Sequence, residues 1–156
     1  MVEKIVILSK KDLAEACDLA NARMSGVSQL KLQDKHGAEG GRNLEYHLLG
    51  ARGEVAFKKY VGSNQALTVN TFRSQPDVLE FEVRTRREDD YDLILRKDDP
   101  DHKTYVLVVG SACRYRIAGW IKGSERYDHE PKTYNDRPKA WFIPQSALHR
   151  IEELQF

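Results

Sequence analysis

The side chains best suited to chemistry in this chain are concentrated in one short run, from Pro76 to Arg84. Within this run, Asp77 precedes Glu82 and Arg84, and Glu54 supplies a further carboxylate upstream. Hard divalent cations such as Mg²⁺ prefer a few carboxylate oxygens and keep several waters. A cation held in this way activates water and offsets charge on a phosphate, and a nearby basic side chain adds to that stabilisation. These residue types therefore indicate a metal site for phosphodiester hydrolysis.

A strand is expected to position the second half of this run. Charged residues alternate with apolar and hydroxyl-bearing ones from residue 78 to residue 86, which is typical of a half-buried strand. Because successive side chains of a strand point to opposite faces, Glu82, Arg84 and Arg86 share one face with Glu80. We expect this face to line a cleft while the other face packs on the core. The alternative is an ordinary solvated face with cross-strand charge pairs.

A helix is predicted just upstream, over residues 44–61. Glu54 and Lys58 lie one turn apart and share a face of this helix, so both approach the acidic run if the helix packs beside the strand. Gly50 and Gly53 lie inside the helix, where each costs about 1 kcal/mol relative to Ala. Their presence predicts a close approach of another backbone or room for a ligand. An exposed ion pair is the alternative for Glu54 and Lys58.

The rest of the pattern predicts one earlier helix, several strands and a closing helix. The first helix begins at Ser9, where Asp12 completes a capping box, and ends at Gly26. Residues 104–109 are almost wholly apolar, which predicts a buried central strand. Further strands are expected over residues 4–8, 66–72, 91–96, 114–121 and 140–143, a long loop over 122–139, and a final helix over 145–154.

The charge balance limits which partners the whole surface can attract. The chain has 156 residues and a formal net charge of +1, with 40% hydrophobic and 31% charged residues. No global basic field attracts nucleic acid, so a polyanion site must be a local patch. The length is that of one domain, and the order of elements predicts an α/β (mixed α+β) class with helices flanking a central sheet.

The cysteines and the apolar runs bear on the compartment. Cys17 and Cys113 are far apart and lack the spacing of metal ligands, which favours an intracellular, reduced protein. No apolar run approaches the roughly 20 residues that span a bilayer, and the start of the chain lacks a signal-peptide pattern. We expect a cytoplasmic protein that makes no use of a membrane.

Pro76-Asp77 followed by Glu82-x-Arg84 resembles the motif of the PD-(D/E)XK nuclease superfamily. The segment from Gly50 to Phe57 resembles the first core helix of that fold, which often supplies an additional metal-binding glutamate. The resemblance covers roughly residues 44–154 and extends to small nuclease-fold proteins encoded by bacteriophages. It is carried further by Glu82–Thr85, Val106–Val109, Ile117–Ile121 and Phe142–Pro144.

The resemblance implies a restriction-endonuclease-like fold, in which helices flank a central mixed sheet. The chain would then be a single nuclease-like domain over residues 1–156, with an N-terminal helical extension at 1–43 and a core at 44–154. Asp77 and Glu82 would be ligands of Mg²⁺ (or Mn²⁺), with Glu54 as an auxiliary ligand.

Arg84 stands where the superfamily usually has lysine. Arginine stays protonated and cannot serve as a base, but it can bind the scissile phosphate. Lys58 shares a helix face with Glu54 and is the candidate to replace the missing lysine. The implied catalytic residues are therefore Asp77, Glu82, Arg84 and Lys58, although the short interval between Asp77 and Glu82 leaves little room for a turn between two strands.

Several arginines around the motif could form the local basic patch that phosphates need. The candidates for nucleic-acid binding are Arg73, Arg84, Arg86 and Arg87. Neighbouring acidic residues make a mixed-charge surface the alternative. The 122–139 loop, which contains Arg126 among other basic and aromatic residues, is a second candidate to grip nucleic acid.

The leading hypothesis is a magnesium-dependent DNA endonuclease acting on branched or processed DNA in phage replication, within the bacterial cytoplasm. DNA is the expected partner, and a homodimer is expected by analogy with enzymes of this fold. The alternative is a catalytically inactive nuclease-fold module that binds nucleic acid or a protein partner, for example an inhibitor of host defence. A third reading is a structural protein whose charged strand is only surface.

Overall fold

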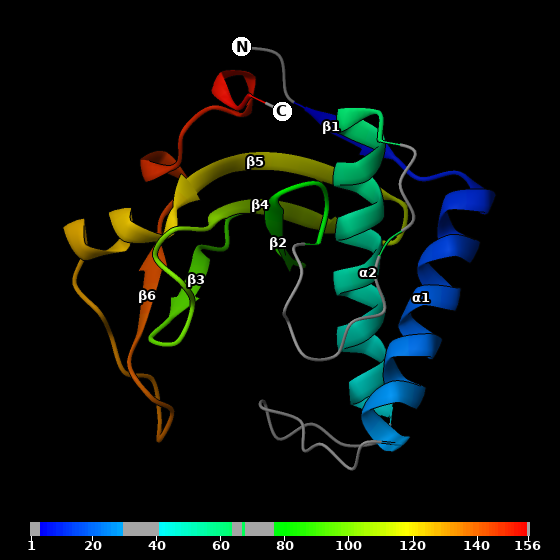
Figure 1. Cartoon of the computed structure of the whole chain (residues 1–156), viewed down its shortest axis with the longest axis horizontal. Helices are drawn as coiled ribbons and strands as arrows, with labels where there is room; N and C mark the ends of the chain where they lie inside the picture. The colour runs from blue at the N-terminus through cyan, green and yellow to red at the C-terminus, as the bar shows by residue number, and fades with distance from the viewer. Residues whose placement is uncertain (1–3, 30–40, 64–66, 68–76, 156) are drawn as a thin grey trace.

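The computed structural model describes residues 4–29, 41–63, 67 and 77–155 (Figure 1). Within them the chain forms two α-helices and six strands, joined by short 3-10 turns. These are β1 (Ile5–Ile7), α1 (Lys10–Gln29), α2 (Gly41–Val61), β2 (Phe81–Arg86), β3 (Leu93–Arg96), β4 (Thr104–Ser111), β5 (Arg114–Lys122) and β6 (Ala140–Ile143). Most of the strand expected over 66–72, and Arg73 after it, lies outside the described residues.

Four strands form a mixed sheet in the order β1-β5-β4-β2. β4 pairs in parallel with β2 and antiparallel with β5, and residues 105–109 of β4 are buried, which confirms the prediction of a central apolar strand. β1 pairs antiparallel with β5. β2 therefore lies at an edge of this sheet, and the predicted mixed α/β class is confirmed.

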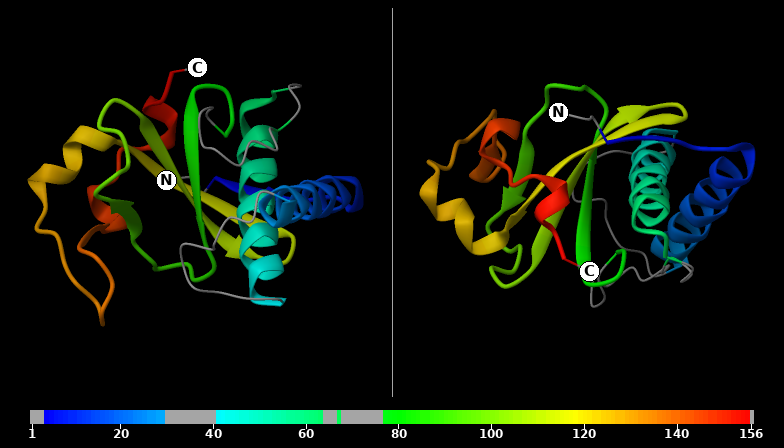
Figure 2. Two further views of the ribbon diagram at one scale, coloured as in Figure 1. Left: turned by 60° about the horizontal axis from the view of Figure 1, so that its bottom comes forward. Right: turned by 90° about the horizontal axis from the view of Figure 1, so that it is seen from above.

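The elements stack in layers on the two faces of this sheet (Figures 1 and 2). α2 covers one face and α1 packs on the outer side of α2. β3 and β6 form a separate antiparallel two-stranded sheet on the other side. One apolar core contains Phe57 of α2 and Phe81 of β2. A second core contains Leu95 of β3 and Leu107 of β4, so the four-stranded sheet lies between two cores.

Gly53 lets α2 approach β2 closely. A Cβ built at Gly53 would lie 1.8 Å from Oγ1 of Thr85, so no larger residue fits there without displacing the strand. This contact explains one of the two glycines for which the sequence predicted a close approach. Gly50 differs, because a Cβ at that position would meet no atom within 4 Å.

α1 begins as the sequence predicted. The backbone N–H of Ser9 donates to the Asp12 carboxylate at 2.8 Å, and the N–H of Asp12 donates to Oγ of Ser9 at 3.1 Å. The prediction that Gly26 ends this helix is wrong, because α1 continues to Gln29. A glycine inside a helix costs only about 1 kcal/mol, which tertiary packing can offset.

The final α-helix predicted over 145–154 is absent. Two 3-10 turns, Gln145–Ala147 and Ile151–Glu153, stand in its place. Between them the N–H of His149 donates to the carbonyl of Trp120 at 2.8 Å, and the N–H of Trp120 donates back at 3.1 Å. This pairing with β5 uses backbone groups that a helix would need, so the chain stays extended here.

The predicted loop over 122–139 begins with a 3-10 turn, Gly123–Asp128, that carries the fully buried Arg126. Arg126 donates to the carbonyl oxygens of Gly123, Arg96 and Asp99 and to the carboxylate of Asp101. Its guanidinium therefore ties this turn to the β3–β4 connection. The reading of Arg126 as a residue that grips nucleic acid is wrong, because a buried and fully engaged side chain cannot reach a ligand.

Candidate functional site

A carboxyl pair stands at the edge of the four-stranded sheet. Glu54 of α2 and Asp77, which precedes β2, share a side-chain hydrogen bond. The Glu54 side chain is only 4% exposed. The contact between Gly53 and Thr85 brings this stretch of α2 close enough to β2 for the two carboxyl groups to meet. The predicted approach of Glu54 to the acidic run is therefore observed.

A tight turn places Asp77 beside the start of β2. Val78 and Phe81 form an isolated bridge, which folds the chain back within a few residues. Oδ2 of Asp77 then accepts the backbone N–H of Val83 at 2.8 Å. Because β2 is an edge strand, this N–H is one that a neighbouring strand does not take. The short interval between the two acidic residues of the motif is thus accommodated by a turn onto a single strand.

The surroundings of Asp77 favour its protonated form. Burial is the largest cause, and the charge and hydrogen bond of Glu54 add to it, which together raise the pKa of Asp77 from 3.8 to about 7. The hydrogen bond from Val83 and the charge of Arg23 oppose the rise in part. Two adjacent carboxylates do not both ionise readily, so Asp77 retains its proton up to about neutral pH.

Glu82 is the third carboxylate, and Lys103 is its partner. Nζ of Lys103 lies 2.7 Å from Oε1 of Glu82. Burial has the largest effect on the pKa of Glu82 and raises it; the Lys103 hydrogen bond opposes this, the charge of Asp77 adds to it, and the net direction is upward. The parallel register sets Glu82 opposite Tyr105, and this brings Lys103, which directly precedes β4, beside Glu82. No local spacing in the sequence links these two residues.

Arg23 of α1 grips Glu54. Its Nη1 binds Oε2 and its Nη2 donates to Oε1 at 3.0 Å, so the pair is bidentate. Arg23 was not predicted from the sequence. The one signal that could have found it is its place three residues after Ala20, at the border of the apolar stripe by which α1 packs on α2.

Lys58 and Arg84 are each engaged by another acidic residue. Nζ of Lys58 lies 2.8 Å from Oε1 of Glu15 on α1. Nη2 of Arg84 lies 2.9 Å from Oδ1 of the buried Asp99, and its guanidinium stands over the ring of Tyr105. The lysine that pairs with Glu82 is therefore Lys103, whereas Lys58 pairs with Glu15.

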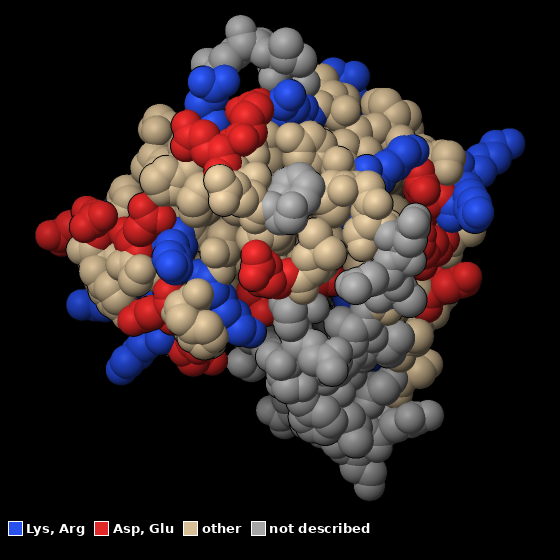
Figure 3. All heavy atoms as spheres, turned by 45° about the horizontal axis from the view of Figure 1, so that its top comes forward, with Lys and Arg blue, Asp and Glu red and all other residues tan. Residues whose placement is uncertain are grey.

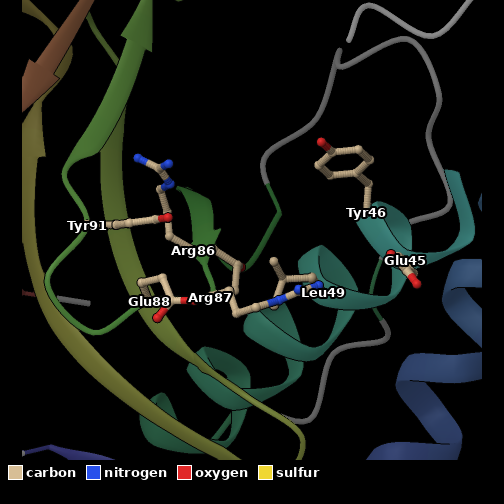
Figure 4. A pocket seen from close by; sticks show the side chains of 8 residues that line it. Glu45, Tyr46, Leu49, Arg86, Arg87, Glu88 and Tyr91 are labelled. Carbon is tan, nitrogen blue, oxygen red and sulfur yellow. The ribbon is translucent and has the colours of Figure 1, made fainter. Parts of the chain in front are cut away.

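Arg86 and Arg87 line an open cleft of about 420 Å³ at the far end of β2 (Figure 4). The Arg86 guanidinium lies 4.3 Å from the ring centroid of Tyr91 and donates to the carbonyl of Asp92 at 3.0 Å. Arg73, the remaining candidate for binding nucleic acid, lies outside the described residues.

The carboxylates fit a hard divalent cation in their chemistry. In the part of the chain that the structure describes, no group of three or more His, Cys, Asp or Glu side chains is already arranged as a ligand set. Glu54 and Asp77 nevertheless present adjacent oxygens joined by a hydrogen bond, and the charge of Asp77 acts on Glu82. Mg²⁺ commonly takes one or two carboxylates and completes its shell with water and phosphate oxygens. A cation that replaces the proton of Asp77 would suit this pair.

Charges of both signs are mixed over the surface. Figure 3 shows Lys and Arg beside Asp and Glu on the face in view, in keeping with the net charge of +1. Neither helix of the described chain has the length and apolar character needed to cross a bilayer.

Comparisons with protein-family models, with curated proteins and with solved structures find no match for this chain. The function is therefore argued from the chain's own residues.

Proposed function

We propose that this chain is a metal-dependent DNA endonuclease with a restriction-endonuclease-like arrangement of helices around its sheet. One observation carries the proposal: Glu54 and Asp77 share a hydrogen bond at the sheet edge, and the charge of Asp77 acts on Glu82. Carboxylates contributed by a helix and an edge strand, beside a lysine, supply the donors that a catalytic Mg²⁺ or Mn²⁺ requires. The resemblance of the motif to nucleases supports the same reaction class.

In this proposal Asp77, Glu82 and Glu54 hold the cation. When bound, Mg²⁺ or Mn²⁺ activates water and offsets charge on the scissile phosphate. Arg23 holds both oxygens of Glu54, which restricts that side chain to one orientation. Asp77 is oriented by the N–H of Val83 and gives up its proton when the cation binds.

Lys103 takes the role that the motif resemblance assigns to a lysine. Arg84 stands at that motif position but is engaged by Asp99, whereas Lys103 reaches Glu82 from the neighbouring strand. An ammonium group beside the metal-binding carboxylates can stabilise charge on the pentacovalent phosphate or orient the attacking water. Lys103 is therefore the better candidate than Lys58, which pairs with Glu15.

The direct test is cleavage of duplex, nicked, flapped and four-way DNA with Mg²⁺ or Mn²⁺. Asp77→Asn and Glu82→Gln should abolish cleavage, and Lys103→Met should lower its rate by about 100-fold, as for loss of one electrostatic contact. Glu80→Gln is the matched control, because this neighbouring carboxylate is exposed. Cleavage at the wild-type rate by either Asp77→Asn or Glu82→Gln would refute the proposal.

A non-catalytic module that binds nucleic acid or a protein partner is the second candidate. It is favoured by the ion pairs that already engage the charged groups of the site, namely Arg23–Glu54, Lys103–Glu82 and Arg84–Asp99. Calorimetric titration with MnCl₂ separates the two candidates. A catalytic site takes up Mn²⁺ and loses that uptake in Asp77→Asn, whereas a module of the second kind takes up none.

A further inference from the structure

The cleft at the far end of β2 is separate from the carboxylates. It lies between the first turns of α2 and the connection from β2 to β3 (Figure 4). Its volume of about 420 Å³ falls within the range of small-molecule sites. Glu82 and Arg86 lie on the same strand, four residues apart, which corresponds to about 13 Å. The cleft is therefore within reach of a strand whose phosphate lies at the carboxylates.

Two tyrosines stand on opposite sides of this cleft. Tyr46 comes from α2 and Tyr91 from the β2–β3 connection, and Figure 4 shows Arg86 and Arg87 between them. The tyrosines are 55% and 43% exposed, which is high for large aromatic side chains. The charged side chains of the cleft are Arg86, Arg87, Glu45 and Glu88, so basic and acidic groups are balanced. Exposed aromatic rings beside arginines are the groups on which unpaired bases stack.

The two arginines differ in how they are held. Arg86 is fixed by its contact with the Tyr91 ring and by its hydrogen bond to the Asp92 carbonyl, so its remaining donors are pre-organised. Arg87 extends across the cleft toward Leu49 and makes no ion pair with any residue that the structure describes. Its guanidinium can therefore bind a phosphate without breaking a salt bridge.

A second hollow, of about 460 Å³, continues from the first. The two share Arg87 and Glu88 in their lining, and the second adds Arg114 at the start of β5. A run of guanidinium groups along adjoining hollows follows the phosphates of an extended strand better than it encloses one small anion. Glu45, Glu88 and Asp89 also line these hollows and oppose binding of a free anion by repulsion, so bases must contribute to affinity.

We propose that these adjoining hollows hold an unpaired stretch of a nucleic-acid strand, with a base against Tyr46 and Tyr91 and phosphates on Arg86 and Arg87. The inference rests on the proposed nuclease function and names its substrate class: DNA with a single-stranded segment, such as a flap or a branch. Continuous duplex cannot place a base between the two tyrosines without unstacking, which costs a few kcal/mol.

The test measures the binding of fluorescein-labelled single-stranded and duplex oligonucleotides by fluorescence anisotropy. EDTA is present, so that cleavage plays no part. The wild-type protein should bind the single-stranded oligonucleotide at least tenfold more tightly than the duplex. Tyr46→Leu combined with Tyr91→Leu should weaken that binding by about 10- to 100-fold, the range for loss of base stacking. Arg87→Gln should make the slope of log affinity against log salt concentration shallower by about one, the amount expected for the loss of one phosphate contact.

Tyr134→Leu is the matched control, because Tyr134 is equally exposed (53%) but packs on Phe142, away from the cleft. Competition with AMP and with inorganic phosphate distinguishes a strand from a free nucleotide. Displacement of the strand by phosphate as well as by AMP would overturn the stacking role. Equal affinity for duplex, or unchanged affinity in the double tyrosine variant, would overturn the inference.

Failure of this inference and failure of the nuclease proposal give different results. A protein that binds single strands through the tyrosines but never cleaves them would retain the cleft's role and lose the catalytic one. A protein that cleaves continuous duplex as fast as flapped DNA, with no effect of the tyrosine substitutions, would retain the catalytic role and lose the role of the cleft.

Discussion

Replacing Asp77 by asparagine should raise the stability of this protein at neutral and alkaline pH while removing the proposed cation binding. The asparagine amide can donate to Glu54 as the protonated carboxyl does, and its oxygen can still accept the N–H of Val83. Asparagine never ionises, so the repulsion between two buried carboxylates cannot arise. The same substitution removes a proposed metal ligand, so stability and the proposed function should change in opposite directions.

The size of the effect follows from the pKa of Asp77, which is about 7 in the folded protein against an ordinary value of 3.8. Between these values the folded protein holds a proton that the unfolded chain has released. The free energy of unfolding of the wild-type protein therefore falls as pH rises through this window, by up to about 1.4 kcal/mol per pH unit. The upper limit is about 4 kcal/mol, and we expect about half of it because local relaxation and water penetration relieve part of the cost of burying a charge.

Urea unfolding followed by circular dichroism at pH 4, 6 and 8 measures this difference. The two proteins should be nearly equal at pH 4, and Asp77→Asn should be ahead by about 2 kcal/mol at pH 8. The exposed Glu80→Gln is the control and should keep the pH dependence of the wild-type protein. An identical pH dependence in Asp77→Asn, or lower stability than wild type at pH 8, would refute the reasoning.

Three further outcomes are expected. Binding of Mn²⁺ should release about 0.9 proton per site at pH 6 and about 0.1 at pH 8, measured by calorimetry in buffers of different ionisation enthalpy; a constant value would contradict the raised pKa of Asp77. Gly53→Ala should destabilise by about 3 kcal/mol in thermal melts because its Cβ would lie 1.8 Å from Oγ1 of Thr85, whereas Gly50→Ala, with open space around it, should be neutral or stabilising. Arg126→Met should cost about 3–5 kcal/mol because buried acceptors lose their donor, and a melting temperature within a few degrees of wild type would exclude that role.

The parts of the fold that were predictable are those decided by periodicity and local capping. Alternation over β2 and β5 and the apolar run of β4 located these strands, because a strand's burial repeats every second residue. The capping box of α1 is likewise local. The final helix was wrong because the backbone around His149 pairs with Trp120 of β5, a contact between distant residues that no helical periodicity reports.

Part of the candidate site was also predictable. Glu54, Asp77 and Glu82 could be named because their residue types and the elements carrying them are visible in the sequence. Their partners could not: Lys58 and Arg84 were plausible by spacing, yet Glu15 and Asp99 engage them. Several acidic residues could pair with each basic side chain, and only the positions of these residues in the folded chain decide which ion pairs form.

Local sequence settles which carboxylates are available and on which helix and strand each is carried. The tertiary structure decides that Arg23 pairs with Glu54 and Lys103 with Glu82, and that the carboxyl groups of Glu54 and Asp77 lie close enough to form a hydrogen bond. The physical reason is that these contacts depend on the packing of α1 on α2 and on the parallel register of β2 with β4. Both arise from burial of apolar surface between elements far apart in the chain, which no short-range spacing encodes.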